Sequence, residues 1–173
     1  EAGLGTVSGN WSKNVGVGHN VLYKLQSGEE NIALGDSAGF NITTGDNNVA
    51  LGASALASIT TGANNVAIGK SALFTADGAE SNNVAIGESA MLSVTGDTSE
   101  KNIAIGRLAL TGGSGAVIGN IAIGHKAMDS TGSNNQTGTI AIGQEALTAL
   151  TSGAANTAIG YLAGEELVSG SDN

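Results

Sequence analysis

The sequence predicts an all-β protein, namely a parallel β-solenoid of nine coils with 17–19 residues in each coil. Three observations predict this fold: a short motif repeats nine times, its glycines recur at a nearly fixed spacing, and no apolar run at helical spacing is long enough for a stable helix. A clear copy of the motif is Asn65-Val66-Ala67-Ile68-Gly69. A near-fixed period in this range is typical of stacked units that contact mainly their neighbours.

The closing glycine of the motif recurs with gaps of 17, 17, 17, 18, 19, 18, 19 and 17 residues. These glycines are Gly18, Gly35, Gly52, Gly69, Gly87, Gly106, Gly124, Gly143 and Gly160. Residues 14–173 are therefore interpreted as one repeat domain, and residues 1–13 as an irregular N-terminal segment or a degenerate coil. Because the chain starts at Glu1 and ends inside a repeat, we expect it to be a fragment of a longer chain.

Each coil divides in the same way. Within the motif, β-branched or leucine side chains alternate with alanine, which predicts a short strand with two different faces. The two variable residues after the glycine indicate a turn, and the following Ala72-Leu73 and its equivalents predict a second, shorter strand. Segments such as Thr61-Gly62-Ala63-Asn64 predict a return turn, because glycine and asparagine tolerate positive φ. Residues 111–119 contain an extra strand-like run that this scheme does not place.

The two faces of the strand carry different side chains. We expect the larger aliphatic residues to form the repeat core: Val49, Leu51, Val66, Ile68, Val84, Ile86, Ile103 and Ile105. The opposite face carries a column of alanines: Ala33, Ala50, Ala67, Ala85, Ala104, Ala122, Ala141 and Ala158. An exposed face would carry Thr, Lys or Glu in some coils, so we expect this column to pack against a neighbouring chain in a symmetric oligomer. In the alternative, alanine lines a narrow interior while valine and isoleucine meet the partner.

The asparagine that opens the motif predicts a third column. Its members include Asn31, Asn48, Asn65, Asn83, Asn102 and Asn120. A buried polar side chain left unpaired costs about 1–3 kcal/mol, so asparagines repeated at one corner must find partners. We expect their side chains to satisfy backbone groups of the turns or to bond to one another along the rod.

The motif Asn-Val-Ala-Ile-Gly-x-x resembles the head repeats of YadA-like trimeric autotransporter adhesins, and similar repeats occur in bacteriophage tail fibres. The resemblance covers residues 14–173 and rests on nine matches. It implies a homotrimer of left-handed parallel β-rolls at a bacterial surface, presented for adhesion. The chain departs from the family in its longer period and in having alanine, as at Ala38, Ala55 and Ala72, where the family has its terminal serine. Binding to matrix proteins is therefore not carried over.

Composition and motifs argue against several other functions. The formal net charge of −9 disfavours nucleic acids and anionic membranes, and the chain has no cysteine. Gly69-Lys70-Ser71 lacks the earlier glycine of a phosphate-binding loop, since Asn64 stands in its place. His19 and His125 occupy a variable position without Ser or Asp partners in the pattern. We expect no catalytic residues, no cofactor and no metal site.

These observations favour a non-enzymatic, trimeric surface adhesin head module that mediates or presents attachment to a host or other surface. The expected partners are two further copies of the chain and a surface receptor, protein or glycan, that the sequence does not identify. The expected location is the bacterial cell surface, with anchoring to the outer membrane through parts outside this chain and no membrane insertion by this segment. The alternative is a structural or receptor-binding section of a bacteriophage tail fibre, located in the virion tail. The sequence does not decide whether the segment binds a receptor itself or only acts as a spacer for the part that does.

Overall fold

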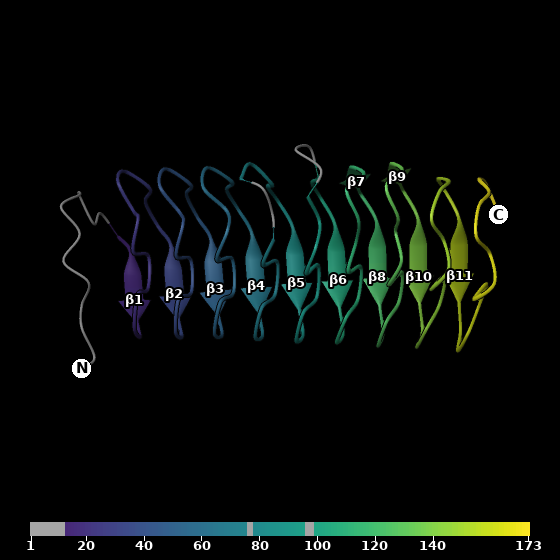
Figure 1. The fold of residues 1–173 in the computed structure, drawn as a ribbon, viewed down its shortest axis with the longest axis horizontal. Helices are drawn as coiled ribbons and strands as arrows, with labels where there is room; N and C mark the ends of the chain where they lie inside the picture. The colour runs from purple at the N-terminus through teal and green to yellow at the C-terminus, as the bar shows by residue number, and fades with distance from the viewer. Residues whose placement is uncertain (1–12, 76–77, 96–98) are drawn as a thin grey trace.

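The structure is a computed structural model that describes residues 13–75, 78–95 and 99–173. The chain winds into a rod of stacked turns, with the strands side by side along it and with the first strand and the C-terminal residues at opposite ends of the described part (Figure 1). The described residues contain strands and turns and no helix. The all-β fold and the parallel β-solenoid are therefore confirmed. Residues 1–12, the larger part of the expected irregular segment, lie outside the described residues.

Nine three-residue strands form one sheet in which all neighbouring strands are parallel. In order along the rod they are β1 (Val15–Val17), β2 (Ile32–Leu34), β3 (Val49–Leu51), β4 (Val66–Ile68), β5 (Val84–Ile86), β6 (Ile103–Ile105), β8 (Ile121–Ile123), β10 (Ile140–Ile142) and β11 (Thr157–Ile159). Each strand comes from one copy of the motif, as expected, and eight complete turns separate β1 from β11. We number the coils 1 to 9 in this order.

The closing glycine explains why the register is the same in every coil. Gly69 has φ of +129° and stacks on the backbone of Gly87, so that an added Cβ would lie 2.6 Å from the Gly87 carbonyl oxygen. A side chain is excluded both by this contact and by the positive φ. The resulting register pairs Ala67 with Ala50 on one side and with Ala85 on the other.

The prediction of a second strand after each glycine is wrong. Ala72 lies between two residues in the left-handed conformation, Ser71 (φ 55°) and Leu73 (φ 50°), and the segment is a turn. Two left-handed residues so close together bend the backbone and prevent an extended strand. The segment still bonds from coil to coil, since the N–H of Leu73 donates to the carbonyl oxygen of Ala90 at 2.9 Å. The bend also turns Leu73 fully into the core.

A second, smaller sheet accounts for the run that the sequence did not place. β7 (Val117–Ile118) pairs in parallel with β9 (Gln136–Thr137) in the return segments of coils 6 and 7. Single bridges extend this ladder from Ile118 to Glu100 and on to Ser81. The longer coils therefore use their extra residues in a common second ladder instead of in unrelated loops.

The core runs inside the coil, and the alanine column lines it. The strand alanines of coils 2 to 8 are at most 1% exposed, and they belong to one core cluster with the turn alanines and leucines. Their expected packing against a neighbouring chain is wrong, because the chain's own coil already encloses them. The alternative, in which alanine lines a narrow interior, is the one observed.

The larger aliphatic residues of the strands are correspondingly not the core. Val49, Leu51, Val66, Ile68, Val84, Ile86, Ile103 and Ile105 are all half-buried and lie on the outward face of the sheet. A coil of 17–19 residues has too little interior width for two large side chains of the strand, so these point away from it. The core is instead filled by alanine and by leucine or methionine from the turns.

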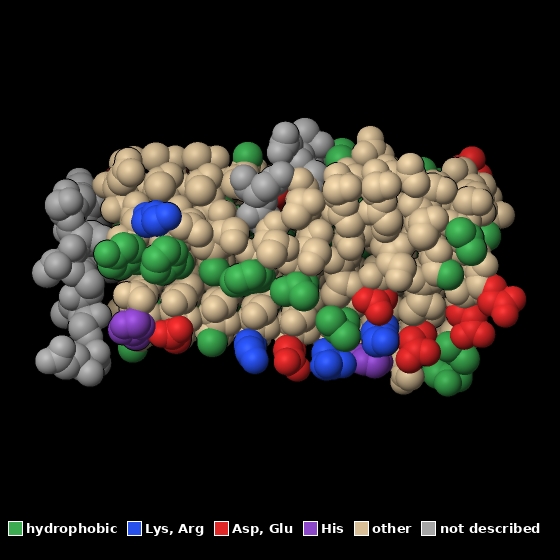
Figure 2. Space-filling model, viewed as in Figure 1, with side chains coloured by type: hydrophobic (Ala, Val, Ile, Leu, Met, Phe, Trp, Pro, Cys, Tyr) green, Lys and Arg blue, Asp and Glu red, His purple; other side chains and the backbone are tan. Residues whose placement is uncertain are grey.

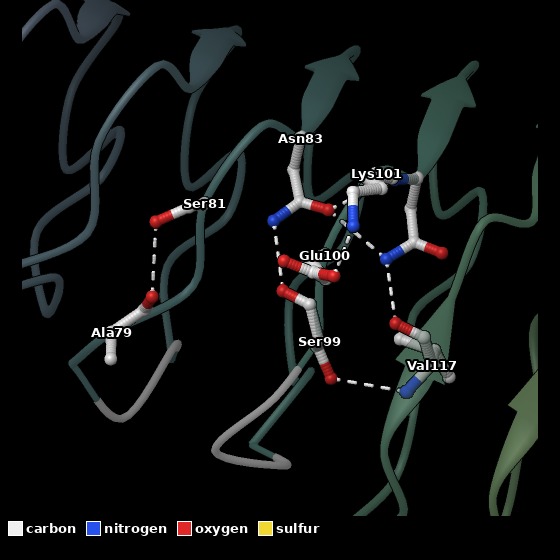
Figure 3. A network of polar contacts seen from close by, with 8 residues as sticks. Ala79, Ser81, Asn83, Ser99, Glu100, Lys101 and Val117 are labelled. Carbon is white, nitrogen blue, oxygen red and sulfur yellow. Dashed lines mark hydrogen bonds and ion pairs between the residues drawn. The ribbon is translucent and has the colours of Figure 1, made fainter.

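The predicted asparagine column is confirmed, and both expected kinds of bond are present. The backbone N–H of Asn83 donates to Oδ1 of Asn65 at 3.0 Å. Nδ2 of Asn83 donates to the carbonyl oxygen of Ser99 at 3.1 Å (Figure 3). The first bond joins neighbouring coils, and the second ties the start of the strand to the return turn of its own coil. Each asparagine therefore holds one corner of the rod in both directions.

Candidate functional site

The most extensive candidate site is the outward face of the nine-stranded sheet. It consists of the first and third residues of each strand, which the in-register pairing arranges in two columns. We call these residues the aliphatic face: Val15, Val17, Ile32, Leu34, Val49, Leu51, Val66, Ile68, Val84, Ile86, Ile103, Ile105, Ile121, Ile123, Ile140, Ile142, Thr157 and Ile159. Thr157 is the single member with a polar group, and none is charged.

The aliphatic face remains accessible in the isolated chain. Toward coil 1 the exposed fractions reach 49% for Val15 and 59% for Val17, and Ile159 at the other end is 67% exposed. The members between are half-buried or exposed, largely because their neighbours in the same column cover them. With parallel strands about 4.8 Å apart, nine strands make an apolar stripe on the order of 40 Å long. Contiguous apolar patches of such extent mark interaction sites on soluble proteins.

A charged or histidine side chain stands directly after the closing glycine in six of the nine coils, namely coils 1, 2 and 4 to 7. His19 Nδ1 lies 2.9 Å from Asp36 Oδ1, and Arg107 Nε lies 3.3 Å from Glu88 Oε2. Figure 2 shows such side chains gathered along one long edge of the rod, with both signs represented. This is the variable position that the sequence indicated as a turn, and Asp36, Glu88 and Arg107 are exposed there, along what we call the rim. These pairs in water contribute little stability.

The opposite end of the strands carries a sparser set of charges. Lys13 lies 2.7 Å from Glu30 and 3.9 Å from Glu29, and Lys101 pairs with Glu100. The hydrogen bond and the negative charge of Glu30, followed by the charge of Glu29, raise the pKa of Lys13 above its ordinary value. The aliphatic face is thus bordered by ion-paired edges at both ends of its strands.

An apolar column that the sequence reading missed lies on the turn that follows the core leucine. The rings of Tyr23 and Phe40 stack with centroids 5.1 Å apart and planes at 8°, and Lys24 Nζ lies 5.6 Å from the Phe40 ring centroid. Tyr23, Phe40 and Phe74 each occupy the fifth position after the closing glycine, in coils 1, 2 and 4. A signal was present in the sequence, since aromatic residues make up only 3% of the chain and three of them share one repeat position.

The residues examined for catalytic or metal chemistry are not brought together. His19 lies in coil 1, Lys70 in coil 4 and His125 in coil 7, so two coils separate each from the next. Among the residues that the structure describes, no group of three or more His, Cys, Asp or Glu side chains is placed to hold a metal ion.

A search of the described residues for a helix long and apolar enough to cross a membrane found none. Comparison of the chain with protein-family models, with curated proteins and with solved structures gave no match.

Proposed function

We propose that the chain is a non-enzymatic, rod-shaped attachment module that works as a homotrimer, with the aliphatic faces of three copies packed against one another. The trimer would present its remaining surfaces for adhesion at a bacterial cell surface. The stripe of uncharged aliphatic side chains along all nine strands carries the proposal. The resemblance of the repeats to YadA-like adhesin heads supports the trimeric state and the adhesive role.

The charges support this assignment of faces. Three copies carry a formal net charge of −27, three times the −9 of one chain, so a stable assembly needs an interface from which charges are excluded. The aliphatic face is the stretch of surface on this rod where nine coils in succession place no charged side chain. Burying a half-exposed valine or isoleucine releases on the order of 1 kcal/mol, and two such residues per coil act together.

Sedimentation equilibrium tests the assembly. The expected mass is about three times the 16.8 kDa of one chain, without dissociation at micromolar concentration. Val66→Glu combined with Ile105→Glu should give a folded monomer, because each substitution places three carboxylates in a dry contact. The matched control is Ala79→Glu combined with Ser133→Glu, which adds the same charge at exposed residues of the return segments and should leave the trimer intact.

A stable monomer of the unmodified chain would contradict the proposed trimer. Adhesion is measured separately, with microspheres coated with the trimer and applied to layers of cultured cells. Retention above that of uncoated microspheres is the expected result. Equal retention would contradict an adhesive role for this segment and leave it as a spacer.

A further inference from the structure

The asparagine column is interrupted at a single coil among the nine strands. Coil 8 begins with Thr139 in place of asparagine. The backbone N–H of Thr139 donates to Asn120 Oδ1 at 2.8 Å, so the column reaches this coil intact. The Thr139 hydroxyl is fully buried and makes no hydrogen bond. It therefore does not accept the N–H of Asn156, although Asn48 Oδ1 accepts the equivalent N–H of Asn65 at 3.0 Å.

The substitution also removes a bond within coil 8. In coils of the same length, the asparagine Nδ2 reaches the carbonyl oxygen fourteen residues later, as from Asn48 to Gly62 at 2.9 Å and from Asn156 to Gly170 at 2.7 Å. The corresponding carbonyl in coil 8 belongs to Gly153. Threonine has no side-chain N–H to donate to it, so the return turn of coil 8 lacks this tie.

Two further buried polar atoms without hydrogen-bond partners lie in the preceding return segment. They are Thr131 Oγ1 and Gln136 Oε1, and together with Thr139 Oγ1 they complete the set of such side-chain atoms found among the described residues. Gln136 Nε2 does bond, to the carbonyl oxygens of Leu150 at 2.7 Å and Thr131 at 3.2 Å. The polar groups whose burial is uncompensated are therefore concentrated in coils 7 and 8.

In a solenoid, stability is approximately a sum of coil terms and of terms for the interfaces between neighbouring coils, so one weak interface can open by itself. We infer that Thr139 creates a weak joint, and that residues 153–173, which form the return turn of coil 8 and coil 9, open as a unit while coils 2 to 6 stay closed. Opening uncovers the edge of β10 for pairing with another strand.

Hydrogen exchange followed by mass spectrometry tests the joint on the 173-residue chain. Peptides covering residues 157–172 are expected to exchange at least about tenfold faster than peptides covering β5 and β6. Thr139→Asn restores an acceptor for Asn156 and a donor for Gly153. It should slow exchange in residues 153–172 by about tenfold, the effect expected of one or two hydrogen bonds with a net contribution near 1 kcal/mol each.

Two variants separate the joint from ordinary fraying at a chain end. Thr137→Asn makes the same change at an exposed residue two positions away and should leave exchange unaltered. Asn102→Thr adds a second interruption at coil 6. It should speed exchange of residues 116–120 by about tenfold, because the N–H of Asn120 loses its acceptor and the carbonyl oxygen of Val117 loses its donor. Unchanged exchange in a folded Thr139→Asn chain would overturn the inference, as would unchanged exchange in Asn102→Thr.

Discussion

Val66 and Ala67 are adjacent in β4, yet they occupy two very different environments. Ala67 is fully buried inside the coil, in register with Ala50 and Ala85, and its column holds only small side chains. Val66 is half-buried on the outward face, where valine and isoleucine interchange from coil to coil. A small residue that is constant at this position therefore indicates limited space inside one chain. The column of Val66 and its equivalents is nearly constant in polarity but not in size, which indicates an apolar surface.

The two environments predict very different costs for a carboxylate placed at one residue or at the next. Ala67→Glu forces a charge into a dry, filled interior and should lower the free energy of unfolding by at least about 3 kcal/mol, or prevent folding. Val66→Glu places the same charge on the outward face and should lower the stability of the single chain by about 1 kcal/mol. Chemical denaturation followed by circular dichroism measures both.

Val66→Glu and Ala67→Glu also distinguish the role of the strand in assembly from its role in folding. Val66→Glu should stay folded while its sedimentation mass falls, whereas Ala67→Glu should lose the fold itself. Equal destabilisation by the two variants would contradict the assignment of inward and outward faces.

A smaller effect is expected at the corner next to these residues. Asn65→Ala removes the acceptor for the backbone N–H of Asn83 and the donor to the Glu80 carbonyl, at 3.0 and 2.7 Å respectively. Leaving these buried groups unpaired should cost about 2–3 kcal/mol, less than Ala67→Glu but more than a surface change. Thermal unfolding measures it, with Asn134→Ala as the control, since that exposed side chain makes one bond of 3.3 Å to Thr151. Equal melting temperatures would show that the column is dispensable.

The sequence predicted the coil period, the first strand and the asparagine column, because each recurs in all or nearly all coils with a residue type that the local structure restricts. It could not decide the direction of the strand faces, since alternation with period two defines two faces without saying which one the chain encloses. It also predicted a second strand at Ala72-Leu73. A left-handed φ at leucine is uncommon, so the residue types did not predict the bend at Leu73.

The candidate site was predicted in part. The two faces of the strand were identified from the sequence. The expectation placed the larger aliphatic residues in the interior and the alanines against a neighbouring chain, with the reverse arrangement as the alternative, and the structure shows the alternative for the alanines. Whether Val66 or Ala67 points outward depends on the corners at Gly69, Ser71 and Leu73, which together make the interior narrow. The width of the interior is set by the closed coil, so it cannot be deduced from the order of apolar residues in the sequence.

Changes at the charged rim should affect the protein least. Lys70 and Glu88 are exposed at the rim in consecutive coils, directly after the closing glycines that end β4 and β5. Lys70→Ala with Glu88→Ala keeps the net charge at −9, removes the Glu88–Arg107 pair, and should change the free energy of unfolding by less than about 1 kcal/mol. The sedimentation mass should also stay unchanged, because the aliphatic face is intact. Dissociation of this double variant would mean that the rim, rather than the aliphatic face, holds the chains together.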